Sequence, residues 1–118
     1  MNRVAMTIVR EVMRVDELKQ MAGRMFGNMV KAVVDVDREW LAVDAELHSD
    51  LEALLLEHGS VQQHLWGINL YPELEGRAFI EFDSMINMRP SQGNRSREVE
   101  SAALCAKIVS VVEKWIAR

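Results

Sequence analysis

The chain has 118 residues, of which 49% are hydrophobic and 27% are charged. These proportions are typical of a globular protein and exclude a disordered chain, a collagen-like repeat and a coiled coil. A chain of this length fits one domain and can bury roughly two thirds of the surface that its unfolded form exposes. We therefore expect a single domain that spans residues 1–118.

The charge and the single cysteine restrict the partners of the protein. The formal net charge is −4, from 14 basic and 18 acidic residues, so we expect no nucleic-acid partner and no membrane surface. Cys105 is the only cysteine, which excludes an intrachain disulfide and agrees with a reducing cytoplasm. Arginines interrupt the start of the chain, and no apolar run reaches the roughly 20 residues of a membrane helix. These patterns predict a cytoplasmic protein without a cofactor.

The start of the chain predicts a strand followed by a helix. Residues 4–12 are rich in β-branched side chains, which favour a strand. Asp16 can cap the start of a helix, because the apolar residues that follow it recur at helical spacing. The pair Gly27-Asn28 ends this helix, since both residues tolerate the left-handed conformation that often follows one.

Residues 29–47 predict a β-hairpin whose turn lies near Asp37-Arg38. Apolar and polar side chains alternate on both sides of that turn. The two apolar sets share one face of the hairpin only when the loop has an even number of residues, because a shift of one residue turns every side chain over. We therefore expect Val34 to lie opposite Leu41.

The second half of the chain repeats the plan of a helix followed by a hairpin. The run Ser49-Asp50-Leu51-Glu52 matches a capping box, in which the serine caps the helix and the glutamate reaches back to it. This motif predicts a helix over residues 50–58. Residues 64–71 and 78–88 alternate as two strands, joined by a turn over residues 72–77.

A broad apolar stripe predicts a final helix from about Ser96 to Ala117. The element order is then strand, helix, hairpin, helix, hairpin, helix. Antiparallel hairpins with interposed helices favour an α+β two-layer sandwich with a mostly antiparallel sheet. We expect the helices to cover the apolar face of this sheet and the opposite face to be polar.

Three stretches carry a resemblance to a known family. They are residues 47–52, 65–72 and 79–97, which include the runs Trp66-Gly67-Ile68-Asn69 and Arg89-Pro90-Ser91-Gln92-Gly93-Asn94-Arg95-Ser96. In these motifs, and over nearly the whole chain, the sequence resembles a small prokaryotic family of domains of unknown function. The resemblance implies no activity, cofactor or catalytic residue, so the candidate sites rest on the residues themselves.

The loop before the final helix is the first candidate site. It gathers side chains that can donate hydrogen bonds, namely Arg89, Ser91, Gln92, Asn94, Arg95, Ser96 and Arg97. A helix start presents unpaired backbone N–H groups, and arginine binds phosphate or carboxylate with paired hydrogen bonds. The pattern predicts an anion site at the start of the helix, near residues 94–97. The alternative is structural: Asn94 or Ser96 caps the helix while the arginines pair with nearby carboxylates.

Carboxylates and one histidine form the second candidate site. Asp44, Glu46 and His48 recur at every second residue, which places them on one face of a strand, and Glu81 and Asp83 share a face of another. Such a group could bind a divalent metal or act as acid and base. A polar outer face of the sheet explains the same pattern. The histidines lack the spacing of a zinc site, so we predict no metal.

Aromatic residues suggest an interface. Trp40, Tyr71 and Phe79 fall on the expected outer face of the sheet. Aromatic side chains in a polar setting are common at interfaces, so we expect a homo-oligomer, most simply a homodimer. Asn69 either lies beside the arginine-rich loop or belongs to a core segment in which Gly67 admits a neighbouring side chain. Cys105 is expected to be a buried, unreactive thiol.

Three functional hypotheses follow from these patterns. The first is a small cytoplasmic binding module that holds a phosphate or carboxylate at the arginine-rich loop. The second is a phosphoester hydrolase-like enzyme, in which His48, Asp50 and Glu52, or the outer carboxylates, act with the same arginines. The third is a structural or interaction protein whose polar motifs only stabilise turns. The sequence leaves the choice between an enzyme and a binding protein open.

Overall fold

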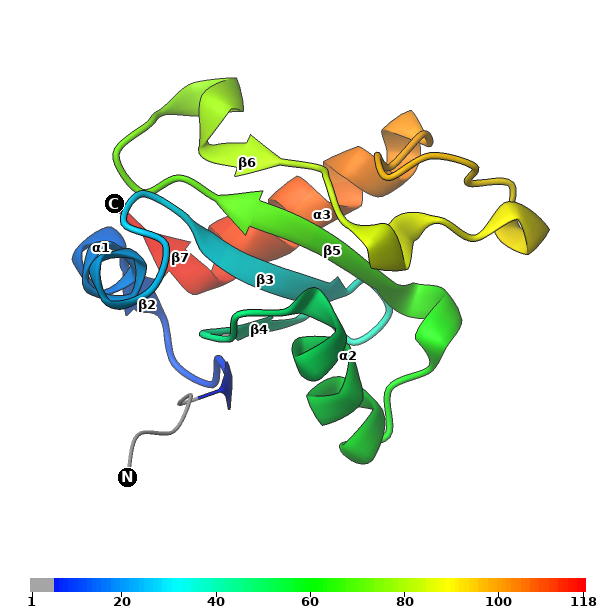
Figure 1. Cartoon of the computed structure of the whole chain (residues 1–118), viewed down its shortest axis with the longest axis horizontal. Helices are drawn as coiled ribbons and strands as arrows, with labels where there is room; N and C mark the ends of the chain where they lie inside the picture. Colours follow the sequence, from blue (N-terminus) through cyan, green and yellow to red (C-terminus); the bar gives the residue numbers. More distant parts are fainter. Residues whose placement is uncertain (1–5) are drawn as a thin grey trace.

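A computed structural model describes residues 6–118 of the chain. Its main sheet has the strand order β1-β4-β3-β5-β6, and all neighbouring strands are antiparallel. The strands are β1 Thr7–Ile8, β3 Val30–Asp35, β4 Trp40–Val43, β5 Leu65–Leu70 and β6 Ile80–Glu81. Within the described residues the α-helices are α1 Val15–Arg24, α2 His48–Glu57 and α3 Ala102–Trp115 (Figure 1). The predicted α+β class, with three helices and an antiparallel sheet, is confirmed.

Strands β3 and β4 form the first hairpin, with residues 36–39 as its loop. Val34 lies opposite Leu41, so the predicted register and the even loop length are confirmed. The Asp35 side chain holds the turn and is only 1% exposed. Its carboxylate accepts two backbone N–H groups of the loop at 2.9 and 3.0 Å, and the hydroxyl of Ser60 at 2.6 Å.

Strands β5 and β6 form the second hairpin, in which the two strands differ in length. All of β5 is buried and pairs with β3, whereas β6 pairs with β5 through Ile80 and Glu81 alone. The predicted return strand over residues 78–88 is therefore much shorter than expected. The chain leaves the sheet after β6, and its turn at Met85–Asn87 packs against β5 and α2.

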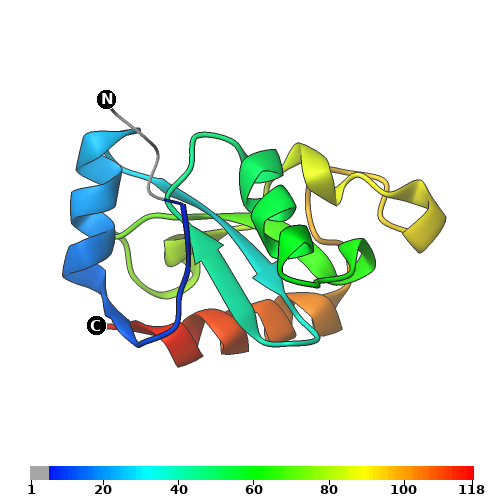
Figure 2. The same cartoon turned by 90° about the horizontal axis from the view of Figure 1, so that it is seen from below.

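Helices cover both faces of the sheet, as Figure 2 shows with the sheet between α2 and α3. Helices α1 and α3 pack on the face that carries Val34, Leu41 and Ile68. Helix α2 packs on the opposite face over Val33 and Leu65. We expected the helices on one face only. The second face is also apolar at these positions, so α2 can bury it.

Two helices begin earlier than predicted. Helix α1 begins at Val15 rather than after Asp16, and its preceding residue makes no side-chain capping bond. Helix α2 begins at His48 and follows Leu47, so Ser49 does not cap it and the predicted capping box is wrong. The His48 ring makes a hydrogen bond to the sheet. This tertiary contact outweighs the local capping preference, which is worth about 1 kcal/mol.

The last helix begins later than predicted. Helix α3 starts at Ala102, and the Ser101 side chain caps it by accepting the N–H of Leu104 at 3.2 Å. The predicted start at Ser96 is therefore wrong. Serine is a good cap at either position, but the segment before Ser101 is held in a loop by its own side chains.

A second sheet joins the segment before α1 to the C-terminus. It pairs β2 Met13–Arg14 in parallel with β7 Ile116–Ala117. The predicted first strand over residues 4–12 is confirmed only at β1, and residues 4 and 5 lie outside the described part of the chain. Between residues 6 and 118, no helix is long and apolar enough to cross a membrane.

Candidate functional site

A row of polar side chains crosses three strands on the face of the sheet that carries α2. Lys31 of β3 lies opposite Asn69 of β5, and Asn69 lies opposite Glu81 of β6. Residues directly opposite each other on antiparallel strands project from the same face as close neighbours. The row lines a cleft together with the start of α2. The strand pairing therefore brings together three groups that are far apart in the sequence.

His48 joins this cleft from the first turn of α2. Its side chain is buried, and its Nε2 lies 2.8 Å from the carbonyl oxygen of Ile68. A carbonyl oxygen can only accept a hydrogen bond, so Nε2 carries the proton and Nδ1 keeps its lone pair. Burial lowers the pKa of His48 below its usual 6.5, although the Ile68 carbonyl, the Asp83 carboxylate and the Asn69 side chain act in the opposite direction. The imidazole is therefore neutral at neutral pH.

Asp83 and Arg97 form an ion pair that lines the same cleft. Arg97 Nε donates to Asp83 Oδ1 at 2.7 Å. This hydrogen bond lowers the pKa of Asp83 and raises the pKa of Arg97, so both groups stay charged. The Arg97 carbonyl also accepts the N–H of Ser84 and the side-chain amide of Asn87, both at 3.0 Å. These bonds fix the backbone from which the guanidinium extends.

Asn69 carries a buried oxygen without a partner. Its Nδ2 donates to Glu81 Oε1 at 2.9 Å and to the Asp83 carbonyl at 3.3 Å. Both partners are acceptors, which fixes the orientation of the amide. Asn69 is 5% exposed, and its Oδ1 has no hydrogen-bond partner among the described residues. An unsatisfied buried acceptor costs about 1–3 kcal/mol, and the Asn69 side chain also lies close enough to the His48 ring to raise its pKa.

Tyr71 completes the polar lining beside Glu81. Its hydroxyl donates to Glu81 Oε1 at 2.9 Å. Burial, together with the neighbouring Glu81 carboxylate, raises the pKa of Tyr71, so the hydroxyl remains a donor at neutral pH. The Glu81 carboxylate therefore accepts hydrogen bonds from two side chains of the protein, Tyr71 and Asn69.

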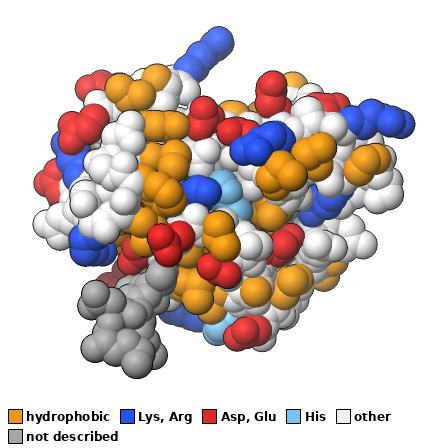
Figure 3. Space-filling view, viewed as in Figure 1, with side chains coloured by type: hydrophobic (Ala, Val, Ile, Leu, Met, Phe, Trp, Pro, Cys, Tyr) orange, Lys and Arg blue, Asp and Glu red, His pale blue; other side chains and the backbone are white. Residues whose placement is uncertain are grey.

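The cleft has a volume of about 490 Å³, which falls within the range of small-molecule sites. Figure 3 shows basic, acidic and histidine side chains gathered near the middle of this face of the molecule. Leu47 and Met85 also line the cleft, and both are strongly exposed. The site therefore combines a polar interior with apolar side chains at its edge.

The first half of the arginine-rich loop binds to the protein itself. Arg89 donates to the carbonyl oxygens of Gln62 and Leu65, and its guanidinium stacks on the ring of Trp66 at 4.1 Å. Gln92 donates to another carbonyl of the same segment at 3.1 Å. These contacts hold the loop against the chain that leads into β5.

The second half of the loop is also held from within. Asn94 is buried, and its side-chain amide donates to the carbonyls of three residues of the surrounding loop. The Glu100 carboxylate accepts the backbone N–H groups of Arg95 and Ser96 at 2.9 and 2.8 Å. An internal carboxylate thus occupies donors that we expected an external anion to use.

Of the loop residues predicted to bind an anion, Arg97 is the one that lines the cleft. Ser91 is exposed, as is Arg95. Anion binding by the loop as a whole stays a prediction. One reason for that prediction no longer holds, because residues 94–97 are not the start of a helix.

The predicted group of Asp44, Glu46 and His48 does not form on one strand face. Strand β4 ends at Val43, and Asp44 has a positive φ of 76° that turns the chain. Asp44 pairs with Arg24 at 3.6 Å instead. His48 then belongs to α2. The alternation continues in the sequence beyond the point where the strand has ended.

The second pair of carboxylates does meet the histidine. Glu81 and Asp83 line the cleft with His48, whereas the predicted catalytic candidates Asp50 and Glu52 lie on α2 outside it. Among residues 6–118, no group of three or more His, Cys, Asp or Glu side chains could hold a metal ion.

The aromatic residues predicted for an interface do not share one surface. Phe79 belongs to the core on the α3 side, Tyr71 lines the cleft, and Trp40 stacks with the Arg38 guanidinium at 4.6 Å. Cys105 is partly exposed rather than buried. Its thiol donates to a backbone carbonyl at 3.2 Å, and burial raises its pKa.

Lys31 is a cleft residue that the sequence pattern does not select. The alternation within the second hairpin aligns Asn69 with Glu81, but the pairing of β3 with β5 joins two separate hairpins. No local pattern sets that register. The expectation that Gly67 admits a neighbouring side chain is confirmed, since a Cβ there would lie 2.5 Å from the Cβ of Ser84.

The fold and the cleft define an α+β protein with helices on both faces of an antiparallel sheet and a polar, ligand-sized cleft beside the start of α2. The family model described as "Protein of unknown function (DUF5674)" matches residues 7–115. The chain belongs to this family, and the resemblance noted in the sequence is confirmed. Searches among curated proteins and among solved structures found no match.

Proposed function

We propose that this protein is a small cytoplasmic binding module that holds a small anionic molecule in the cleft beside α2. The observation that carries the proposal is the cleft lining, in which Lys31 and Arg97 lie together with Asn69, whose buried Oδ1 has no geometrically defined hydrogen bond. A small rotation of the Asn69 side chain would let a hydroxyl or amino group of a ligand reach this acceptor. The ligand class is therefore a carboxylate or phosphate that also carries a hydrogen-bond donor.

The charges that remain available in the cleft favour an anion. Glu81 and Asp83 already accept hydrogen bonds from side chains of the protein. No carboxylate lies within ion-pair distance of Lys31 in the described part of the chain. Arg97 has N–H groups beyond those that bind Asp83. An anionic group beside Lys31 and Arg97 would form charge-assisted hydrogen bonds.

Four matched probes test this proposal by isothermal titration calorimetry. Glycolate carries a carboxylate and a hydroxyl, acetate lacks the hydroxyl, ethylene glycol lacks the charge, and inorganic phosphate replaces the carboxylate. We expect glycolate to bind more tightly than acetate, because its hydroxyl can donate to Asn69. Ethylene glycol should bind weakest. Failure of all four probes to bind would contradict the proposal.

Two arginine variants locate the site. Arg97→Ala is expected to weaken glycolate binding by about tenfold, since it removes a charge-assisted hydrogen bond. Arg95→Ala is the matched control, because Arg95 is exposed on the same loop but does not line the cleft. A loss of binding in Arg95→Ala, with Arg97→Ala unaffected, would place the anion at the loop instead.

The same cleft supports a second candidate function, phosphoester hydrolysis. The observation that favours it is the presence of Arg97, His48 and two carboxylates in one cleft. The neutral His48 ring has a lone pair on Nδ1 that can take a proton from an attacking water. Turnover of bis(p-nitrophenyl) phosphate that is lost in His48→Gln and kept in His58→Gln would support this function. Absence of turnover would contradict the hydrolase function and leave ligand binding as the function of the cleft.

We also propose that the protein forms a homodimer through the edge of the cleft. Leu47 and Met85 line the cleft and are 53% and 63% exposed. Apolar side chains next to a polar site favour contact with another protein surface. This contact replaces the aromatic interface expected from the sequence, because Trp40, Tyr71 and Phe79 lie apart.

A further inference from the structure

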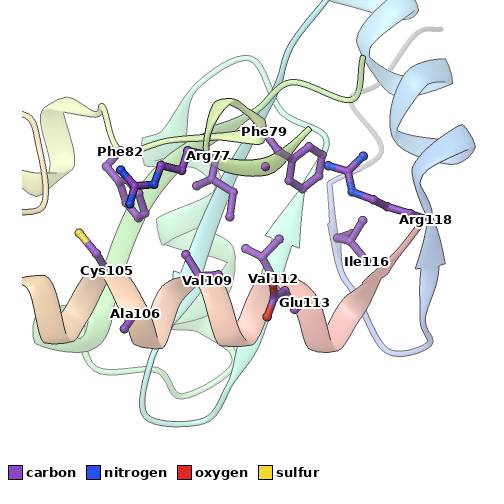
Figure 4. Close-up of a pocket in the computed structure, with 12 residues that line it drawn as sticks. Arg77, Phe79, Phe82, Cys105, Ala106, Val109, Val112, Glu113, Ile116 and Arg118 are labelled. Atoms are coloured by element: carbon purple, nitrogen blue, oxygen red, sulfur yellow. The ribbon is translucent and has the colours of Figure 1, made fainter. Parts of the chain in front are cut away.

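A second cavity lies between α3 and the segment that carries β6 (Figure 4). We call it the α3 groove. Its volume is about 840 Å³, which is within the range of small-molecule sites. Its apolar lining comes from Phe79, Ile80, Phe82, Val109, Val112 and Ile116. It shares no side chain with the polar cleft on the other face.

Three of the six apolar side chains that line the α3 groove are buried, and Ile80, Phe82 and Val109 are half-buried. Val112 is 1% exposed, and Phe79 and Ile116 are each 7% exposed. None of the large hydrophobic side chains that are exposed in residues 6–118 lines the groove. The apolar surface open to a ligand therefore lies mainly on the half-buried side chains, and a narrow alkyl chain can lie along them. The shape therefore favours a small molecule over a second copy of the chain.

Three charged side chains line the groove: Arg77, Arg118 and, on α3, Glu113. Figure 4 shows Arg77 near Phe82 and Arg118 beside Phe79. The Arg118 guanidinium stacks on the Phe79 ring at 4.3 Å and donates to a backbone carbonyl at 3.1 Å. Arg77 is exposed, and no carboxylate of the described residues lies within ion-pair distance of it. Arg77 is thus available to pair with an anion.

We propose that the α3 groove binds an amphipathic monoanion with an unbranched alkyl chain, of the fatty-acid class. The carboxylate pairs with Arg77, and the alkyl chain lies between the Phe79 side and the Val109 side of the groove. Burial of each further methylene should raise the affinity by up to about fourfold. The charge of Arg77 should favour a carboxylate over a neutral head group of similar size.

A chain-length series tests both parts of this proposal. Hexanoate, octanoate and decanoate are titrated below their micelle concentrations, with decanol as the neutral counterpart of decanoate. We expect the affinity to rise along the series and decanol to bind about tenfold more weakly than decanoate. Arg77→Ala should reduce decanoate to the affinity of decanol, while Arg95→Ala leaves it unchanged. Equal affinities for decanol and decanoate, or no dependence on chain length, would overturn the proposal.

The reactivity of the Cys105 thiol gives a second measure of binding, and it needs no change in the charge of the protein. It lines the groove and is the only cysteine of the chain. Bound decanoate should slow the alkylation of Cys105 by N-ethylmaleimide several-fold, and an unchanged rate would contradict binding at this place. Val109→Trp, checked for its fold by circular dichroism, should fill the groove and abolish decanoate binding. If Val109→Trp changes the mass measured by light scattering but still binds decanoate, the groove is an interface between copies of the chain and the proposal is overturned.

Discussion

Replacing Gly67 with alanine tests how closely the cleft is packed. Gly67 lies in the middle of β5, and a Cβ there would lie 2.5 Å from the Cβ of Ser84 and 2.6 Å from its Oγ. Carbon atoms pack best at about 3.5–4.0 Å, so the two segments would have to separate by about 1 Å. Overpacking of this kind costs about 1–3 kcal/mol.

The separation would also strain two hydrogen bonds. The Gly67 N–H donates to Asn87 Oδ1 at 2.8 Å, and the Asn87 amide donates to the Gly67 carbonyl at 2.9 Å. Each such bond is worth about 0.5–1.5 kcal/mol. We expect Gly67→Ala to lower the free energy of unfolding by about 2–4 kcal/mol, and the melting temperature by roughly 10 °C.

Urea denaturation of the wild type, of Gly67→Ala, of Ser84→Gly and of the double variant measures this effect. The double variant Gly67→Ala, Ser84→Gly lacks the Cβ and Oγ atoms of Ser84 that the new methyl group would meet. Its loss of unfolding free energy should therefore be at least about 1 kcal/mol smaller than the sum of the losses in the two single variants. Gly23→Ala is the control, because a Cβ there meets nothing within 4 Å and alanine favours a helix. A Gly67→Ala variant as stable as the wild type, or additive losses, would refute the reasoning.

The remaining predictions concern the core, the histidine and the oligomeric state. Ile108→Ala should cost about 2–5 kcal/mol in urea denaturation, because Ile108 is fully buried, and a loss below about 0.5 kcal/mol would contradict its place in the core. The pKa of His48 is lowered in the folded state, so the unfolded chain binds more protons as the pH falls below about 6.5. Stability should therefore be retained above about pH 6.5 and decrease as the pH falls below that value, with a smaller decrease in His48→Gln; equal slopes would rule out this linkage. Light scattering should give the mass of two chains for the wild type and of one chain for Met85→Glu, whereas a monomeric wild type would end the dimer proposal.

The register of the first hairpin could be predicted because it depends on whether the loop has an even or an odd number of residues. Only an even loop places the apolar side chains of both strands on one face, and Val34 does lie opposite Leu41. The second hairpin was less predictable. Beyond Glu81 the alternation continues in the sequence, but the Ser84 side chain already accepts the N–H of Ile86 in a turn. A side chain that bonds its own backbone competes with the strand.

The start of α3 shows the limit of local signals. Ser96 and Ser101 are equally good caps by residue type. The choice between them depends on Asn94, whose amide binds the surrounding carbonyls, and on Glu100, which binds the backbone before it. Both contacts need the loop to be folded first. The same reason explains why the sequence did not reveal the cleft: the pairing of Lys31 with Asn69 requires two hairpins to meet.

The position of a bound anion tests the account most directly. Glycolate is added to protein labelled with ¹⁵N, and the signals of the Asn69 side-chain amide, the Arg97 Nε–H and the His48 ring are followed by NMR. We predict saturating shifts of these three signals with one common affinity, and a His48 ring protonated on Nε2 before and after binding. Signals at the cleft that stay unchanged, while those of Arg95 or of the α3 groove move, would contradict the proposed site.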